Sequence, residues 1–390
     1  MLQERGWAVA GGSIALMILW VLFGEIELGV AAVLLLAAVC VAVVFVAMSP
    51  PRLGVSRRTD PVTVHEGDHA SVTLSLANRG RTLRNLTVRD VVSELGTAEF
   101  ALAAVPRGRE LTASYRIMCR PRGVYAIGPA EFEISDPLGL AARSTVMGPV
   151  GTLVVYPSVE QLSGLPSSRG RDLAVNAARP EHNQRGGEDF YTLREYQHGD
   201  DLRRVHWPSS AKRDELMIRQ LETPWQSRAL VILDVRPGSY REDAAFESAV
   251  SGAASVIRHL VHNGYGTDLW AGAGLIDATQ YDPPMEALAA AKTIDYDIVS
   301  LGTRLRSTEA GGVLILVGGR PDRELLALQR LLGAKHPTTV LMSVSDTSST
   351  TGHAFERAGV VSVRIQPGNA WAPAWAQAMR RSWRLASVGS

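Results

Sequence analysis

One carboxylate lies where many α/β proteins place their chemistry. Asp234 directly follows the apolar run 229–233, which has the composition of a strand buried on both faces. Ligands of open α/β sheets bind outside the carboxyl ends of the strands, so a carboxylate there could hold a divalent cation. Two uses of Asp234 without a metal compete with this one: an ion pair with Arg236, or a cap on the following helix.

Histidines beside carboxylates raise the question of acid–base chemistry. A hydrolase could use His206 together with Asp200 or Asp201. However, the spacing of His182, His198 and His206 matches no metal-ligand motif, and the chain has no nucleophile elbow or phosphate loop. We therefore expect no catalytic residue, no enzyme activity and no cofactor, with Mg²⁺ at Asp234 and a hydrolase as the alternatives.

The densest set of polar groups lies in residues 186–219. From Arg185 to Arg219 there are seven basic and seven acidic residues. The aromatic residues among them are Phe190, Tyr191, Tyr196 and Trp207. Balanced charge with interleaved aromatics predicts an ordered surface. Exposed ion pairs contribute only about 0–1 kcal/mol each, so we interpret the segment as a docking surface, either for a partner or for the rest of this chain.

Length and charge narrow the class of protein. A chain of 390 residues predicts two or three domains. The net charge of +1 gives no domain-wide basic excess, which argues against nucleic acid as a partner. The two cysteines, Cys40 and Cys119, lie in an apolar run and a strand-like run, so we expect neither a disulfide framework nor a zinc cluster.

Two uncharged runs, 7–23 and 28–48, predict a transmembrane hairpin. The second run has 21 residues, enough to cross about 30 Å of hydrocarbon at about 1.5 Å per residue. The linking residues 24–27 are a poor signal-peptidase site, which disfavours a signal peptide. The arginines that flank the hairpin are Arg5, Arg52, Arg57 and Arg58. Since the turn carries only Glu25 and Glu27, we expect both ends, and the soluble domains, in the cytoplasm.

The remaining chain divides by its periodicity. Alternating apolar and polar residues between turn signals predict an all-β sandwich over 54–156. Strands alternating with helices from residue 228 predict a doubly wound, mostly parallel α/β domain. The expected parts are therefore a hairpin (1–52), a sandwich (54–156), a linker (157–185), the charged-aromatic segment (186–227) and the α/β domain (228–390).

The α/β domain resembles a von Willebrand factor A domain. The resemblance rests on a first strand that ends in Asp234 and is followed by a loop and a long helix. In that family the Asp begins an Asp-x-Ser-x-Ser loop whose hydroxyls bind Mg²⁺. Here the loop reads Asp234-Val235-Arg236-Pro237-Gly238, so both serines are lost and Arg236 places a cation where the metal belongs.

Nearly the whole chain resembles the bacterial family called domain of unknown function number fifty-eight. Besides the hairpin, the matching stretches are 122–125, 136–140, 155–157 and above all 187–219. The signature residues, which we expect to dock a partner, are Asp189, Arg194, Glu195, Tyr196, Gly199, Asp200, Asp201, Arg203, Trp207 and Arg219. Pro208 departs from the pattern. The resemblance implies membrane-anchored, von Willebrand A-like proteins that serve as adaptors for MoxR-type AAA+ ATPases.

The last helix carries an apolar stripe with a four-residue spacing. Its members are Trp371, Trp375, Met379 and Trp383. We expect this stripe to pack against the sheet. The arginines beside it leave a second use open, as a cationic helix at a membrane surface.

Together these features predict a bacterial multi-pass membrane protein that is a non-catalytic scaffold or adaptor. Its partners would be membrane lipid and a protein, which the family resemblance suggests is a MoxR-type AAA+ ATPase. The alternative is a divalent-metal-dependent ligand-binding domain that uses Asp234.

Overall fold

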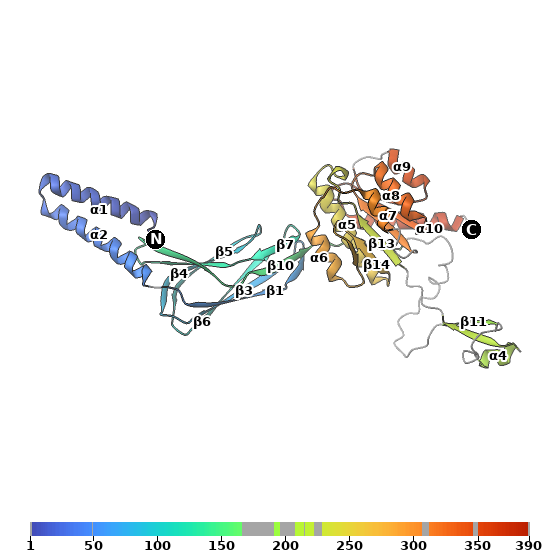
Figure 1. The fold of residues 1–390 in the computed structure, drawn as a ribbon, viewed down its shortest axis with the longest axis horizontal. Coiled ribbons are helices and arrows are strands. Elements are labelled where there is room, and N and C mark those ends of the chain that lie inside the picture. The colour runs from blue at the N-terminus through green and yellow to red at the C-terminus, as the bar shows by residue number, and fades with distance from the viewer. Residues whose placement is uncertain are drawn as a thin grey trace. The chain divides into compact units, whose positions relative to one another are not determined.

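A computed structural model describes residues 2–48, 50–165, 191–195, 207–213, 215–221, 228–305, 312–345 and 350–388. The chain divides into two compact units. The first comprises Met1–Ser158 with Leu288–Ala290, and the second comprises Val159–Ala287 with Ala291–Ser390. The first unit contains two apolar helices and a β-rich region, and the second contains an α/β region (Figure 1). This order agrees with the order of parts expected from the sequence.

The N-terminal helices pair with each other. Helix α1 (Glu4–Phe23) and helix α2 (Ile26–Ala47) are both long and apolar enough to cross a membrane. Gly24 ends α1 in the left-handed conformation, with φ of 73°, and its N–H donates to the carbonyl of Trp20. Between the helices, Ser13 Oγ donates to the carbonyl of Ala32 at 2.8 Å. Most of the large apolar side chains point outward, as a lipid-facing surface would require.

The β-rich region consists of two sheets that share a core. The smaller sheet has the order β1 (Leu53–Asp60), β3 (His69–Asn78), β6 (Glu110–Met118). The larger has the order β2 (Thr63–His65), β10 (Gly151–Tyr156), β7 (Gly123–Ile127), β4 (Leu83–Val92), β8 (Ala130–Ser135), β9 (Ala142–Met147), with β5 (Gly96–Val105) paired to β4. In β3, buried Val72, Leu74 and Leu76 alternate with more exposed polar residues. This alternation is the two-residue period that the sequence showed.

A buried ion pair connects the two sheets. Arg57 of β1 donates from Nη2 to Asp90 Oδ1 of β4 at 2.6 Å, and both side chains are almost fully buried. Tyr115 of β6 donates its hydroxyl to Asp90 Oδ2 at 2.7 Å. Because an unpaired buried charge is costly, each of these groups depends on the others.

A turn of the β-rich region touches the base of the hairpin. Residues 136–141, which we call the 136–141 turn, join β8 to β9. Leu2 forms an antiparallel bridge with Ala141, and the N–H of Gln3 donates to the carbonyl of Leu140 at 3.0 Å. Gly6 lies so close to Leu140 that a Cβ there would be 2.0 Å from its carbonyl oxygen. The hairpin and the turn are therefore packed backbone to backbone.

The α/β unit contains a six-stranded sheet. Its order is β15 (Leu275–Asp277), β14 (Gly266–Trp270), β13 (Arg228–Leu233), β16 (Val313–Gly318), β17 (Thr338–Val344), β18 (Val361–Ile365). All neighbours are parallel except β14 and β15. The helices are α5 (Asp243–His262), α6 (Asp282–Ala290), α7 (Ile298–Leu305), α8 (Arg323–Gly333), α9 (Thr350–Arg357) and α10 (Trp371–Val388). The mostly parallel sheet was expected from the sequence, whereas β15 and α7 were not.

The apolar stripe of α10 packs against the protein. Trp371, Trp375 and Met379 are at most 2% exposed. The indole N–H groups of Trp371 and Trp375 donate to the carbonyls of Ser248 and Gly164. This confirms the expected packing for three of the four stripe residues, and the side chain of Trp383 lies outside the described residues. The buried side chains of Trp371 and Trp375 are therefore not available to a membrane surface.

The start of α10 is capped by a residue from far away in the chain. The N–H groups of Trp371 and Ala372 donate to the two carboxylate oxygens of Glu160, each at 2.9 Å. Glu160 thereby satisfies two of the unpaired donors at the helix N-terminus. The residues just after Ser158 are consequently attached to the α/β unit, within the stretch that the sequence suggested was a linker.

We predict that Asp90→Ala lowers the free energy of unfolding of the β-rich region by about 3–5 kcal/mol, because the buried guanidinium of Arg57 would lose its carboxylate partner. Tyr115→Phe should cost about 1.5–3 kcal/mol, the usual value of a hydrogen bond to a charged group. Urea unfolding followed by circular dichroism measures both values. The matched control is Arg89→Ala, which removes exposed pairs with Glu99 and Glu131 and should cost far less than Asp90→Ala, because solvent screens exposed pairs. An equal cost for Asp90→Ala and Arg89→Ala would contradict the prediction.

Candidate functional site

The strand order places the candidate site between β13 and β16. From β13 the chain continues to β14 on one side, and it returns to β16 on the other side. Such a reversal opens a crevice at the carboxyl ends of the two strands, where ligands of open α/β sheets bind. Asp234 follows β13 at this place, Gly318 ends β16, and Gly319 and Arg320 follow β16.

The loops after β13 and β16 approach each other closely. The N–H of Arg320 donates to the carbonyl of Ser239 at 2.8 Å. A Cβ at position 319 would lie 2.1 Å from the same carbonyl oxygen, so only glycine fits there. The crevice is therefore narrowed by the backbone itself.

The carboxylate of Asp234 is saturated by groups of the protein. Its Oδ1 accepts from the backbone N–H and the Nε of Arg236, at 3.1 and 3.0 Å. Its Oδ2 accepts from Arg236 Nη2 at 2.8 Å and from Ser239 Oγ at 2.5 Å. The side chain is only 1% exposed. The expected pairing of Asp234 with Arg236 is thus confirmed.

Arg236 also binds the start of α8. Its Nη1 lies 2.5 Å from Glu324 Oε2 and 3.0 Å from Asp322 Oδ2. Asp322 in turn caps α8, because its Oδ1 accepts the N–H of Leu325 at 2.7 Å. Burial lowers the pKa of Arg236, but the hydrogen bonds and charges of Asp234 and Asp322 outweigh it and hold the pKa above its usual value. One guanidinium group therefore carries a permanent positive charge among three carboxylates.

Two tyrosines flank the pair. The hydroxyl of Tyr240 donates to the backbone carbonyl of Asp234. Burial, together with the charge of Asp234, raises the pKa of both Tyr240 and Tyr296. Both phenols therefore stay neutral near pH 7, and neither adds a negative charge that could bind a cation.

These residues do not fit the Mg²⁺ ion that the von Willebrand A resemblance implies. Mg²⁺ requires about six oxygen ligands in a regular octahedron, whereas both oxygens of Asp234 are already engaged with nitrogen and hydroxyl donors. The guanidinium of Arg236 also repels a second cation at this position. Within the described ranges, no group of three or more His, Cys, Asp or Glu side chains is arranged to hold a metal.

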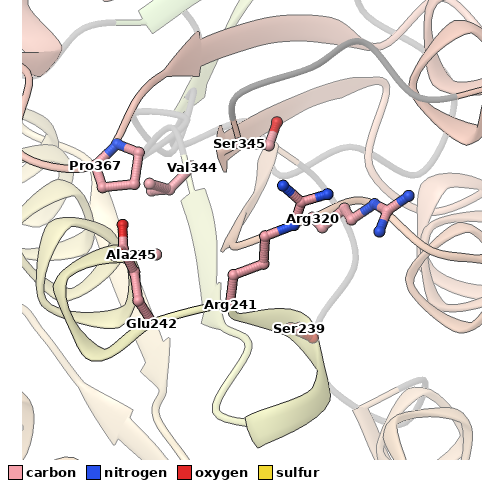
Figure 2. Close-up of a pocket in the computed structure, with 8 residues that line it drawn as sticks. All are labelled: Ser239, Arg241, Glu242, Ala245, Arg320, Val344, Ser345 and Pro367. Atoms are coloured by element: carbon pink, nitrogen blue, oxygen red, sulfur yellow. The ribbon is translucent and has the colours of Figure 1, made fainter.

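A small pocket lies beside the Asp234–Arg236 pair. Its lining residues are Ser239, Arg241, Glu242, Ala245, Arg320, Val344, Ser345 and Pro367. Figure 2 shows Arg241 and Arg320 on one side, with Glu242, Ala245 and Pro367 on the other. The pocket volume of about 20 Å³ is near that of one water-sized group. The pocket therefore suits the tip of a side chain better than a whole metabolite.

The charged-aromatic segment is described only in part. Strand β11 (Tyr191–Glu195) pairs antiparallel with β12 (Met217–Leu221), which places Leu193 opposite Arg219 and Arg194 opposite Ile218. Helix α4 (Trp207–Arg213) begins with Trp207, whose side chain is 66% exposed. The signature residues outside the described residues are Asp189, Tyr196, Gly199, Asp200, Asp201 and Arg203. The histidines His182, His198 and His206, on which the hydrolase alternative relied, are also outside.

Sequence reasoning missed two residues of this site as partners of Arg236. Asp322 and Glu324 bind the guanidinium across 86 and 88 residues of sequence, a separation that no local pattern reveals. A signal for Asp322 was present, because an Asp just before an apolar helical pattern is typical of an N-cap.

One protein family and one curated protein match this chain. The family described as "Protein of unknown function DUF58" matches residues 192–363. The chain is similar to the "Uncharacterized protein YeaD" of Bacillus subtilis (strain 168), with 30% identity over 222 residues, which cover 55% of this chain and 54% of that protein. The chain thus spans about half the length of the curated relative that it matches.

Similarity to solved structures is weak. The CARDB domain of the PF1109 protein of Pyrococcus furiosus is 14% identical, with a TM-score of 0.21, and covers 27% of this chain and 93% of that chain. The sporulation control protein Spo0M of Bacillus subtilis is 10% identical, with a TM-score of 0.17, and covers 27% of this chain and 50% of that chain. Similarity at this level supports no argument about function.

We predict that Arg236→Ser converts the Asp234 cluster into a weak cation site. Removing the guanidinium leaves carboxylate and hydroxyl oxygens, which bind divalent cations with dissociation constants on the order of 10⁻⁴–10⁻³ M in weak sites. Mn²⁺ should therefore raise the melting temperature of the variant and leave that of the wild type unchanged. The double variant Arg236→Ser with Asp234→Asn should lose the effect. Stabilisation of the wild type by Mn²⁺ would show that Arg236 does not occupy the place of a cation.

Proposed function

We propose that this chain is a membrane-anchored, non-catalytic scaffold that presents its α/β region to a protein partner. The observation that carries the proposal is the saturated carboxylate of Asp234. The position at which this architecture usually binds a ligand is filled by Arg236 of the same chain. A group that is held by four internal hydrogen bonds is not available for proton transfer or metal binding.

The surface around this pair favours a protein as the partner. The neighbouring pocket holds little more than one water-sized group, and the side chains of Arg241 and Arg320 at its edge are exposed. Exposed arginines that flank a small recess suit an acidic side chain of a partner, because a guanidinium binds a carboxylate through two parallel hydrogen bonds. Such contacts determine which partner binds and in which orientation.

The N-terminal helices support membrane anchoring. Both are long and apolar enough to cross a bilayer, and their outward side chains are mostly exposed. The flanking arginines favour a cytoplasmic location for the soluble regions, which are then within reach of a cytosolic protein. The family resemblance suggests that this partner is a MoxR-type AAA+ ATPase. In that arrangement the ATPase carries out the chemistry, and this chain supplies location and a specific surface.

The strand order of the α/β region supports a von Willebrand A-like interpretation. Counted within the region, the order of strands is three, two, one, four, five, six, which is the order of a doubly wound sheet. The region would differ from a metal-binding von Willebrand A domain at Arg236, whose guanidinium takes the place of the metal ion. The scaffold proposal therefore needs no metal in the partner interface.

We predict that docking depends on Arg241 and Arg320. A photoreactive benzoylphenylalanine in place of Gln366, the exposed neighbour of Pro367, should form a crosslinked product in native membranes. The double charge reversal Arg241→Glu with Arg320→Glu should reduce that product at least tenfold, which corresponds to about 1.4 kcal/mol of binding free energy. Quantitative mass spectrometry measures the product.

The matched control is Arg330→Glu, a reversal of an exposed charge at the other end of α8, which should leave the product unchanged. A further variant, Arg203→Glu, tests whether the charged-aromatic segment also contacts the partner. The scaffold proposal fails if the photoreactive residue at position 366 yields no protein crosslink, or if a purified chain shows an enzyme activity that Asp234→Asn abolishes.

A further inference from the structure

We propose that the 136–141 turn is a third membrane contact, which lies in the headgroup region and outer hydrocarbon of the bilayer beside the hairpin. The ligand is the lipid surface itself. This inference rests on the proposed membrane anchoring. It assigns a role to a motif, Asp136 to Leu140, that scaffolding by the α/β region leaves unexplained.

The first argument is length. Val39, Ala42 and Val46 of α2 pack with Leu140 and Ala141 of the turn. The part of α2 beyond this contact, residues 26–38, is only about 20 Å long at about 1.5 Å per residue. In α1, where Val9 joins the same cluster, residues 10–23 give about 21 Å. A hydrocarbon core is about 30 Å thick, so the uncovered part of the hairpin is about 10 Å too short.

The second argument concerns the tip of the hairpin. Glu25 and Glu27 lie there, and both side chains are exposed. Carboxylates inside the hydrocarbon are costly, so the tip must reach the headgroups on the far side. Because the uncovered helices are too short for this, their covered base must enter the near leaflet. The turn packed on that base then enters with it.

The third argument is that the backbone N–H groups of the turn need no water. Both carboxylate oxygens of Asp136 accept N–H groups, from Leu138 at 2.8 Å and from Leu140 and Ala141 at 2.6 Å each. The N–H of Asp136 donates to the carbonyl of Ala141, and the N–H of Gly139 donates to the carbonyl of Asp136. Pro137 has no N–H. Every backbone N–H group from 136 to 141 is therefore satisfied within the protein, which lowers the cost of placing this turn at the edge of a membrane.

The fourth argument is the set of side chains at the turn and at the adjoining base of the hairpin. Leu138 at the tip of the turn is 64% exposed, although it is a large apolar residue. Trp7, next to the glycine that contacts Leu140, is 67% exposed. Tryptophans are enriched at the membrane–water interface, and exposed arginines such as Arg5 bind anionic headgroups. An apolar tip, an interfacial aromatic and a cation together form a surface suited to lipid.

The test places an environment-sensitive fluorophore at single cysteines of the full chain, reconstituted in liposomes that contain phosphatidylcholine and phosphatidylglycerol. The three labelled variants are Leu138→Cys, Leu34→Cys in α2 and Val150→Cys in the loop after β9, and the original side chains are similarly exposed at 64%, 64% and 60%. Val150 is separated from the turn by the six residues of β9, or about 20 Å. Lipids with a nitroxide near the headgroup quench the fluorophore wherever it contacts the bilayer.

The two native cysteines must not react with the fluorophore. Cys40 is exposed and is replaced by alanine, whereas Cys119 is fully buried. Burial also raises the pKa of the Cys119 thiol, which keeps it protonated and slow to react.

We expect quenching at Leu34→Cys and Leu138→Cys, with a blue-shifted emission at both, and little quenching at Val150→Cys. Quenching at Leu34→Cys without quenching at Leu138→Cys would overturn the inference while leaving the membrane anchor in place. Equal quenching at Leu138→Cys and Val150→Cys would also overturn it, because the contact would not be specific to the turn. Absence of quenching at all three positions would contradict the proposed anchoring itself.

Discussion

The structure of the α/β region depends on one guanidinium group bound to three carboxylates. Arg236 pairs with Asp234 at the end of β13 and with Asp322 and Glu324 at the start of α8. It thus connects the two loops whose approach defines the crevice. The partly buried side chain of Arg236 cannot lose its charge near neutral pH, unlike histidine, and it cannot dissociate, unlike a metal ion. The local charge balance is therefore part of the fold and does not depend on a ligand.

Buried carboxylates in the β-rich region are also held by partners within the same chain. Asp90 is held by Arg57 and Tyr115, and Asp136 is held by backbone N–H groups. In each case a carboxylate with almost no exposure joins segments that are distant in sequence or organises a turn that does so. A buried charge that lost its partner would cost several kcal/mol, so these contacts fix which segments meet. The carboxylates of Asp90, Asp136 and Asp234 therefore specify structure.

The sequence predicted the parts with strong local signals. Two uncharged runs predicted α1 and α2, the two-residue period predicted strands such as β3, and the spacing of Trp371, Trp375 and Met379 predicted a buried face of α10. Contacts between distant residues were beyond local patterns: the capping of α10 by Glu160, and the binding of Arg236 by Glu324. Asp234 itself was found, together with its pairing to Arg236, because both partners lie in one short loop.

If the chain is the scaffold that we propose, its surface around Arg236 is fixed, and this limits how docking can be controlled. In a metal-dependent surface, loss of the ion would switch binding off, whereas Arg236 keeps its positive charge. The membrane contact proposed for the 136–141 turn adds a second constraint, because a β-rich region held at two points by the bilayer cannot turn freely about the hairpin. Control of docking would then lie with the partner or with the charged-aromatic segment, since the positive charge in the Asp234 cluster belongs to the chain itself and cannot dissociate.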